Sequence, residues 1–322
     1  MKKLNTILIG GGHQSRKEHL PALIFSDLFE LIGIVEPDQI AREEIVHILD
    51  GKNIPIMERI EELDRHINKK IDMAVVSVPH DQYLPIINFC AQRGVHILKE
   101  KPFARNEDEA KQIYDIAKKS KIKIMTSFQR RFHPIYQNFK VMLKQIGEIT
   151  SVEASYTLGS KKPNSGWRSD IKKAGGGVMM DMGYHMIDLI FWYIDPFKVI
   201  DKSLTINRKG DYNTDDTSFI TFEVGNVKGF IFVSCIYPIK NEQFIVIGSK
   251  GSAILKKNRI ERYNLSHELV EHLEGDGTWA QAMQKQLEYF YEVIVDNKDQ
   301  FISNPEFQLN NHVKVMSRIY EQ

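Results

Sequence analysis

Short apolar runs alternate with amphipathic stretches along the first 128 residues. The apolar runs predict strands buried on both faces, over Thr6–Ile9, Leu31–Val35, Met73–Val78, Val95–Leu98 and Ile122–Phe128. The stretches between them have the apolar spacing of helices, over Gln39–Leu49, Leu84–Arg93 and Glu107–Lys119. Because parallel strands need crossover connections, this alternation predicts an α/β domain with a doubly wound parallel sheet.

The pattern changes after Phe128. A helix is expected over Pro134–Gln145, then a strand with one exposed face over Ile149–Leu158 and a polar loop over Gly159–Ala174. Between Val199 and Leu255 the pattern is mostly strands, at Ser218–Val224, Lys228–Cys235 and Gln243–Ile247. Two helices follow, over Trp279–Asp296 and Gln308–Tyr320. We therefore expect two domains, residues 1–128 and 129–322, the second with an antiparallel sheet.

Composition excludes several classes of function. The 322 residues are 42% hydrophobic and 26% charged, with a net charge of +1 that provides no field to attract nucleic acid or an anionic membrane. No apolar stretch approaches the roughly 20 residues of a membrane span, and the amino-terminal apolar run is too short for an export signal. The sequence does not exclude a disulfide between Cys90 and Cys235, but two free thiols in a reducing cytoplasm are the simpler interpretation. We expect a cytoplasmic protein.

A glycine turn follows the first predicted strand. Gly10 permits the tight turn, and Gly12 lets the backbone approach a pyrophosphate at the start of the next helix, beside His13 and Gln14. Ser15 stands where the usual fingerprint has its third glycine, and Pro21 is expected to kink or end the helix that follows. These residues predict a dinucleotide site, although an ordinary strand–helix turn remains an alternative.

An acidic residue at the end of the second strand favours the dinucleotide interpretation. Glu36 stands 24 positions after Gly12, where a carboxylate binds the adenosine ribose hydroxyls. Pro37 and Asp38 follow, so a 2′-phosphate would meet carboxylates rather than a basic residue. The sequence therefore favours NAD over NADP.

Three further segments carry a resemblance to the Gfo/Idh/MocA oxidoreductases. The first is Glu100-Lys101-Pro102, at the end of the run that begins at Gly94. The second is Trp167-Arg168, followed by the block GGGVMMDMGYHMID over Gly175–Asp188, and the third is the turn GSKGS over Gly248–Ser252. The glycine–aspartate–histidine block is the most specific of the three, and together they span nearly the whole chain in the family's order.

The resemblance implies a Rossmann domain followed by an α/β domain with a large open-faced antiparallel sheet. Such sheets often form oligomer contacts in the family, so a homodimer or homotetramer is expected. It also implies that Ser77, Pro79, Glu100 and Lys101 contact the cofactor. Tyr83 departs from the family, because many members have a histidine four residues after the strand-end proline.

The resemblance assigns the chemistry of hydride transfer at a secondary alcohol or ketone of a sugar, cyclitol or sugar derivative. It implies that His185 is the general acid/base, that Asp181 assists proton transfer and that Lys101 binds the reacting oxygen. Removal of the hydroxyl proton needs a base with a pKa near the working pH, which histidine has. Asp181 and His185 share one helix face at a spacing of four, and a charge like that of Lys101 beside a developing alkoxide is commonly worth about 3 kcal/mol. A cis Lys101–Pro102 bond would aim the lysine inward.

These residues also allow other interpretations. Asp181, His185 and Asp188 have a spacing that metal ligands also use, but no fourth ligand follows, so we expect no metal and give Asp188 a structural role. Arg168 is the preferred substrate contact, with Trp167 packing on a sugar face or in the core. We expect structural ion pairs or solvent to account for most of the neighbouring cations, namely Arg130, Arg131, Lys161, Lys162, Lys172 and Lys173.

Two other functions remain as alternatives. One is an NAD-dependent glycosidase that uses transient oxidation. The other is a non-catalytic NAD-dependent regulatory protein, which has no need of Lys101, Asp181 and His185 together.

Overall fold

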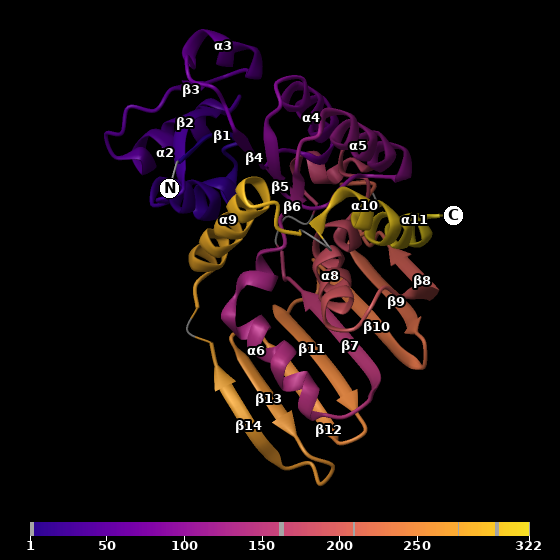
Figure 1. The fold of residues 1–322 in the computed structure, drawn as a ribbon. Coiled ribbons are helices and arrows are strands. Elements are labelled where there is room, and N and C mark those ends of the chain that lie inside the picture. Colours follow the sequence, from indigo (N-terminus) through magenta and orange to yellow (C-terminus); the bar gives the residue numbers. More distant parts are fainter. Residues whose placement is uncertain (1–2, 161–163, 209, 276, 300–302, 322) are drawn as a thin grey trace. The chain divides into compact units, whose positions relative to one another are not determined.

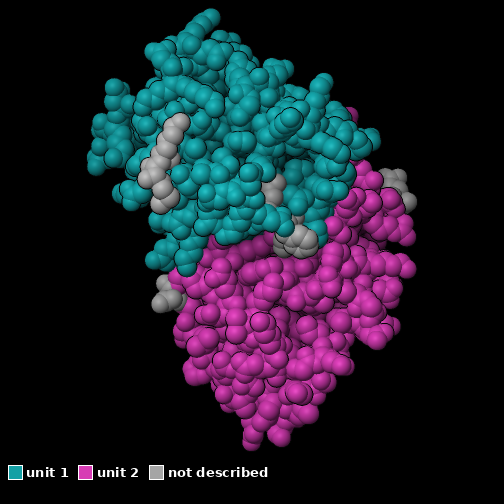
Figure 2. Space-filling model, viewed as in Figure 1, with its two compact units in different colours: residues 1–104, 108–129, 278–309 teal, residues 105–107, 130–277, 310–322 magenta. Residues whose placement is uncertain are grey.

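The computed structural model describes residues 3–160, 164–208, 210–275, 277–299 and 303–321. The chain forms two compact units, which Figure 2 colours separately. The first comprises residues 1–104, 108–129 and 278–309, and the second comprises residues 105–107, 130–277 and 310–322. The segment 278–309 therefore lies in the first compact unit, and the assignment of a cofactor domain to 1–128 and a substrate domain to 129–322 stays a prediction.

The first unit contains a parallel sheet of six strands. They are β1 (Leu4–Ile9), β2 (Phe29–Val35), β3 (Ile56–Met57), β4 (Met73–Val76), β5 (His96–Lys99) and β6 (Ile124–Thr126), in the order β3-β2-β1-β4-β5-β6 (Figure 1). Every neighbouring pair is parallel. The order reverses between β1 and β4, which is where a doubly wound sheet binds its ligand. The predicted fold class is confirmed.

Helices accompany the strands of this sheet. They are α1 (Leu20–Ile24), α2 (Gln39–Leu49), α3 (Leu63–His66), α4 (Tyr83–Gln92), α5 (Glu107–Ser120), α9 (Trp279–Val295) and α10 (Pro305–Phe307). The amphipathic helix α9 comes from the far end of the chain, yet Leu287 and Phe290 join the same core as Leu8 of β1 and Phe29 of β2. This burial explains why α9 belongs to the first unit.

The second unit contains a sheet of eight strands. They are β7 (Ile149–Thr157), β8 (Lys198–Thr205), β9 (Thr217–Val224), β10 (Val227–Ser234), β11 (Asn241–Gly248), β12 (Gly251–Lys256), β13 (Arg259–Tyr263) and β14 (Leu269–Glu274). Their order is β14-β13-β12-β11-β7-β10-β9-β8 (Figure 1). All neighbours are antiparallel except β7 and β10, which pair in parallel. The sheet is thus mixed rather than wholly antiparallel. The parallel pair joins β7 to β10, which are separated in the sequence by β8 and β9.

One face of this second sheet is covered by helices. They are α6 (Pro134–Met142), α7 (Ile171–Ala174), α8 (Tyr184–Tyr193) and α11 (Lys314–Tyr320), of which α6 contacts β12 and β13, α8 contacts β7 and α11 contacts β8. In β9, Ile220 and Phe222 point to the covered face and are buried, whereas Phe219 points to the other face and is 40% exposed. The expected open-faced sheet is present.

Two further features concern membrane spans and cysteines. Among the described residues, no helix is both long and apolar enough to cross a membrane. Cys90 and Cys235 are buried free thiols rather than a disulfide, in agreement with the simpler of the two interpretations.

Candidate functional site

The glycine turn of the first unit has the geometry of a nucleotide-binding loop. Gly10 has a φ of +92°, and a Cβ there would lie 2.1 Å from the carbonyl oxygen of Ser77. The fully buried Ser15 donates its hydroxyl to the Gly10 carbonyl, so the residue in place of the third glycine closes the turn. A Cβ on Gly12 would meet nothing within 4 Å. The space beside Gly12 is therefore open to the close approach of a ligand.

The helix after the turn is irregular. A π-helical segment, Ser15–His19, leads directly into α1, with Pro21 in the first turn of α1. Proline needs no N–H partner there, so the helix continues and ends at Ile24. The expected effect of Pro21 is thus a short, irregular helix rather than a break.

Glu36 lies at the end of β2, directly beside this turn. Its carboxylate accepts hydrogen bonds from the backbone N–H of Gly11 at 2.5 Å and of Asp38 at 2.8 Å, and the side chain is largely buried. These two bonds fix a negative charge at the carboxyl edge of the sheet. A bound ribose would find an acceptor for its hydroxyls here, so the residues present fit a dinucleotide.

The other predicted cofactor residues follow the same edge. Ile9, Val76 and Lys99 are aligned at the ends of β1, β4 and β5. The segments that begin just beyond them contain Gly10, Ser77 and Glu100. His13 is exposed and Gln14 half-buried, whereas Ser77, Pro79 and Lys101 are also half-buried. Because parallel strands end at one edge, the structure brings these predicted residues to one side of the first unit.

Side chains from two other segments contact the Glu100-Lys101-Pro102 turn. The Glu100 carboxylate lies 2.9 Å from Nε2 of His19, and burial alone would raise the pKa of Glu100, but this bond and the nearby cations hold it below its usual range. The Lys101–Pro102 peptide bond is cis, which is the isomer that the sequence analysis considered. Tyr83, the departure from the family pattern, is buried, and its hydroxyl lies 3.4 Å from the Lys101 carbonyl oxygen.

In the second unit, the glycine run begins the helical segment with Asp181 and His185. Asp215 accepts hydrogen bonds from the N–H groups of Gly177 at 2.7 Å and Met179 at 3.0 Å, and a Cβ on Gly177 would lie 2.0 Å from the Asp215 carbonyl oxygen. Tyr320 donates its hydroxyl to the same carboxylate. The sequence did not single out Asp215 or Tyr320; the Asp-Asp pair before a strand was the signal that could have indicated the first.

Asp181 and His185 lie on successive turns of this segment. Asp181 is in the π-helical stretch Met179–Gly183, and His185 is in the first turn of α8, with both side chains half-buried. A π-helical stretch often occurs at a functional site, because it redirects side chains without ending the helix. Both candidate proton-transfer groups are therefore accessible on a firmly anchored helix.

The preferred substrate contacts join this pair. The Nε atom of Arg168 lies 3.1 Å from the Asp181 carboxylate, and the Arg168 guanidinium lies 4.3 Å from the centre of the Trp167 ring. The side chains of Arg168 and Asp181 are 47% and 33% exposed, so solvent or a ligand reaches both. Trp167, Arg168 and Asp181 thus form one open cluster in the second unit.

Arg130 and Arg131 are excluded from a substrate role by their burial. Arg130 pairs with Glu242 at 2.9 Å, and Arg131 pairs with Asp188, which His312 also contacts at 3.2 Å. Burial alone would raise the pKa of Asp188, but the Arg131 charge and the His312 bond hold it below its usual range. Asp188 is therefore structural through its side-chain partners Arg131 and His312. Lys161 and Lys162 lie outside the described residues.

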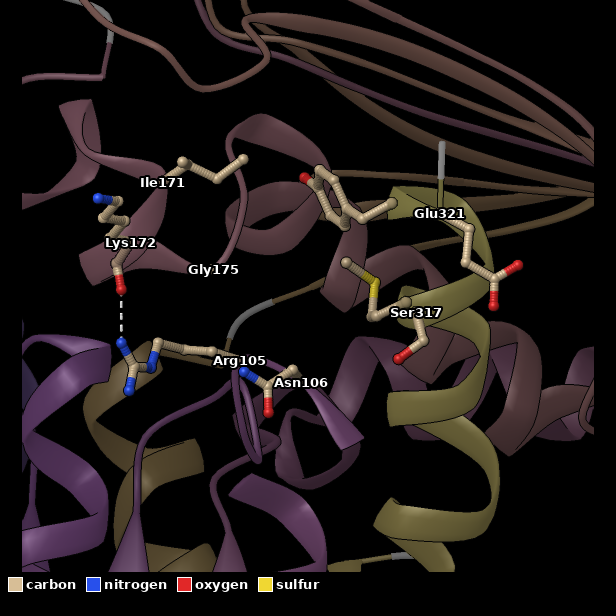
Figure 3. Close-up of a pocket in the computed structure, with 9 residues that line it drawn as sticks. Arg105, Asn106, Ile171, Lys172, Gly175, Ser317 and Glu321 are labelled. Atoms are coloured by element: carbon tan, nitrogen blue, oxygen red, sulfur yellow. Dashed lines mark hydrogen bonds between the residues drawn. The ribbon is translucent and has the colours of Figure 1, made fainter. Parts of the chain in front are cut away.

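A pocket of about 410 Å³ in the second unit lies apart from this cluster (Figure 3). Arg105 donates a hydrogen bond to the Lys172 carbonyl at its margin, and α11 contributes Ser317 and Tyr320. Neither Arg168, Asp181 nor His185 lines it. In the described part of the chain, no three His, Cys, Asp or Glu side chains are arranged to hold a metal ion.

Two family models match the chain. Residues 4–128 match the NAD-binding Rossmann domain of the Gfo/Idh/MocA oxidoreductase family, and residues 139–254 match a Gfo/Idh/MocA C-terminal domain. Among curated proteins, the chain is 27% identical to levoglucosan dehydrogenase of Pseudarthrobacter phenanthrenivorans, over 64% of this chain and 55% of that protein. It is 26% identical to trans-1,2-dihydrobenzene-1,2-diol dehydrogenase of Xenopus laevis, over 56% of this chain and 54% of that protein. The chain thus spans about half the length of these two relatives.

Solved structures share the fold over nearly the whole chain. A levoglucosan dehydrogenase in complex with NADH and levoglucosan superposes with a TM-score of 0.85 at 20% identity, covering 99% of this chain and 96% of the other. A 3-ketoreductase of Actinomadura kijaniata in complex with NADP also superposes with a TM-score of 0.85, at 17% identity, covering 98% of this chain and 97% of the other. At these identities the likeness establishes the fold alone, and the two complexes contain different nicotinamide cofactors.

Proposed function

Because the chain belongs to the Gfo/Idh/MocA family of oxidoreductases, we propose that it transfers a hydride between NAD and a secondary alcohol or ketone carbon of a sugar, cyclitol or sugar derivative. The observation that carries this proposal is the accessible Asp181 carboxylate, held by Arg168 one helical turn from His185. A proton-transfer group beside an oriented carboxylate is what alcohol oxidation needs. The substrate class is supported by the two relatives named above, one named for the sugar derivative levoglucosan and the other for a cyclic diol.

His185 takes the hydroxyl proton in the direction of oxidation and returns it in reduction. When bound, NAD would accept the hydride from the carbon that carries this hydroxyl, so the alcohol loses a hydride to the cofactor and a proton to His185. Asp181 orients the imidazole or the substrate hydroxyl, and Lys101 hydrogen-bonds the reacting oxygen and stabilises its developing charge. Arg168 and Trp167 contact the rest of the substrate, through the guanidinium and the ring face.

The cofactor we propose is NAD rather than NADP. The Glu36 carboxylate, fixed by the N–H groups of Gly11 and Asp38, would accept bonds from ribose hydroxyls and repel a 2′-phosphate. Binding of NADH and NADPH, measured by fluorescence titration, tests this directly. A clear preference for NADPH would overturn the assignment.

Copies of the chain are proposed to assemble through the open face of the second sheet, as a homodimer or homotetramer. Phe219 and Phe230 stack on this face with their centroids 5.6 Å apart, and Ile247 is 37% exposed on it. An apolar face of this kind is typical of a subunit interface. Light scattering coupled to size-exclusion chromatography measures the assembly, which we expect to occur in the cytoplasm.

The decisive experiment is a screen for NADH formation with polyols, sugar phosphates and nucleotide sugars. With the substrate found, His185→Ala is expected to lower kcat by about 100-fold or more while leaving NADH affinity within about twofold. His272→Ala, which removes an exposed histidine on β14, is the matched control and is expected to leave kcat unchanged.

The outcomes of the same screen separate the alternatives. Unchanged turnover in His185→Ala would refute the mechanism. Glycoside hydrolysis without net formation of NADH would indicate the glycosidase, and tight NAD binding with turnover of no substrate would indicate the regulatory protein.

A further inference from the structure

A buried lysine ends strand β5, two residues before Lys101. The side chain of Lys99 is fully buried, and it is among the largest buried side chains in the described part of the chain. A buried ammonium is costly unless several groups satisfy it, so its partners indicate what it does. The reaction described above has no use for this amine, because it is not accessible to a substrate.

The partners of Lys99 are backbone carbonyls that flank the proposed catalytic lysine. Its Nζ donates to the carbonyl oxygens of Glu100, at 2.7 Å, and of Pro102, at 2.5 Å. The hydroxyl of Tyr83 lies 3.4 Å from the carbonyl oxygen between them, that of Lys101. Three successive carbonyls are therefore held from the core side by two buried side chains.

The two side chains also hold each other. The Lys99 Nζ lies 3.7 Å from the centre of the Tyr83 ring, and Tyr83 itself is 1% exposed. A cation over the face of a desolvated aromatic ring is attracted by the electrons of the ring. The ring of Tyr83 thus contacts the Lys99 ammonium, and the hydroxyl of Tyr83 contacts the Lys101 carbonyl oxygen of the turn.

We propose that Lys99 and Tyr83 are positioning residues, which clamp the backbone of Glu100-Lys101-Pro102 so that the Lys101 side chain is held in its reactive place. The proposal rests on the proposed function in that Lys101 is taken to bind the reacting oxygen. The rest of the turn is fixed from other directions, since Glu100 donates its N–H to Val76 and binds His19 through its carboxylate. The clamp thus adds to these contacts by holding the carbonyls of the turn from the side of Lys99 and Tyr83.

A positioning role predicts a specific kinetic signature. A displacement of about 1 Å at a catalytic group can lower turnover by about 100-fold without a matching loss of binding. In Lys99→Met, with cofactor saturating, we expect kcat to fall by about 10-fold or more, while substrate KM and NADH affinity stay within about threefold. Lys99→Gln keeps a neutral donor on a slightly shorter side chain and is expected to recover part of kcat. Tyr83→Phe keeps the ring and removes only one long hydrogen bond, so a smaller loss is expected.

The experiment includes two reference variants measured in parallel. Ile97→Val trims another fully buried side chain of β5 without touching the turn, and it is expected to leave kcat unchanged. Lys101→Ala removes the proposed catalytic group itself. Hydrogen exchange of the amides at Lys101, Phe103 and Ala104 measures the clamp without any activity, and Lys99→Met is expected to accelerate it relative to Ile97→Val.

The outcomes separate the clamp from the mechanism. If Lys101→Ala lowers kcat by about 100-fold but Lys99→Met and Tyr83→Phe leave kcat and exchange unchanged, the clamp is refuted and the mechanism stands. If Lys101→Ala leaves kcat unchanged, the proposed role of Lys101 is refuted. In that case, the hydrogen-exchange measurement alone decides whether Lys99 holds the turn. If Lys99→Met is too unstable for kinetics, the same exchange measurement on Lys99→Gln decides it.

Discussion

Replacing Lys99 by methionine is expected to remove a pH dependence from the stability of the first unit. Burial lowers the pKa of Lys99 from 10.5 to about 7, although the nearby carboxylates of Glu109 and Glu100 oppose the shift. Between these two values the unfolded chain binds a proton that the folded chain has lost. The free energy of unfolding therefore rises with pH across this window, and the contribution is lost as pH falls through about 7.

The size of this effect follows from the two pKa values. The difference between 10.5 and about 7 corresponds to about 5 kcal/mol in full, of which about 3 kcal/mol develops between about pH 6 and pH 9. Urea unfolding of wild type and Lys99→Met across that range, followed by circular dichroism, gives the difference in unfolding free energy between them. This difference isolates Lys99, because every other titrating group is common to both proteins. A difference that stays flat within about 0.5 kcal/mol would refute the reasoning and would mean that the carbonyls and Tyr83 keep the ammonium charged at pH 9.

Four other substitutions test separate parts of the structure. Gly12→Ala is expected to leave the melting temperature unchanged but to weaken NADH binding by about 10-fold or more, measured by fluorescence titration, whereas Gly10→Ala meets the Ser77 carbonyl and is expected to unfold the turn. Equal stability losses in the two glycine variants would contradict this assignment. Asp188→Asn leaves the buried Arg131 without its countercharge and is expected to destabilise the second unit by about 3–5 kcal/mol in urea unfolding, with a loss below about 1 kcal/mol as the contrary result. Glu36→Ala is expected to reduce the preference for NADH over NADPH in the same binding assay. An unchanged ratio of the two dissociation constants would show that Glu36 does not contact the ribose.

The sequence predicted the first sheet well because its strands are buried on both faces. Such strands read as uninterrupted apolar runs, and β4 has all four residues buried. The edge strand β3 has only two residues, Ile56 and Met57, so no run marks it. In the second sheet, β14 is almost wholly exposed and lacks an apolar alternation. The parallel pairing of β7 with β10 depends on contacts between segments far apart in the chain, which local patterns do not encode.

In the candidate site, too, local motifs were visible in the sequence, whereas contacts between distant segments were not. Short motifs located Gly12, Asp181 and His185, because their spacing is fixed by a turn or by a helix. The partners that hold these motifs come from elsewhere in the chain: Asp215 contacts the start of the glycine run, and Lys99 contacts the turn of Lys101. A buried aspartate and a solvated one look the same in a sequence, and only burial and distance separate them.

The contact between Tyr83 and Lys99 gives a physical reason for a tyrosine rather than a histidine at position 83. A histidine there would place a titratable ring against a buried ammonium, and its protonated form would repel Lys99. The phenol ring avoids that repulsion, attracts the cation at 3.7 Å and adds a hydroxyl toward the Lys101 carbonyl. The two positions are therefore energetically coupled, and Tyr83→His should destabilise the wild-type protein by about 1 kcal/mol more than it destabilises Lys99→Met. Additive losses in this double-mutant cycle, measured by urea unfolding at about pH 6 where the ammonium is charged, would show instead that each residue was independent of the other.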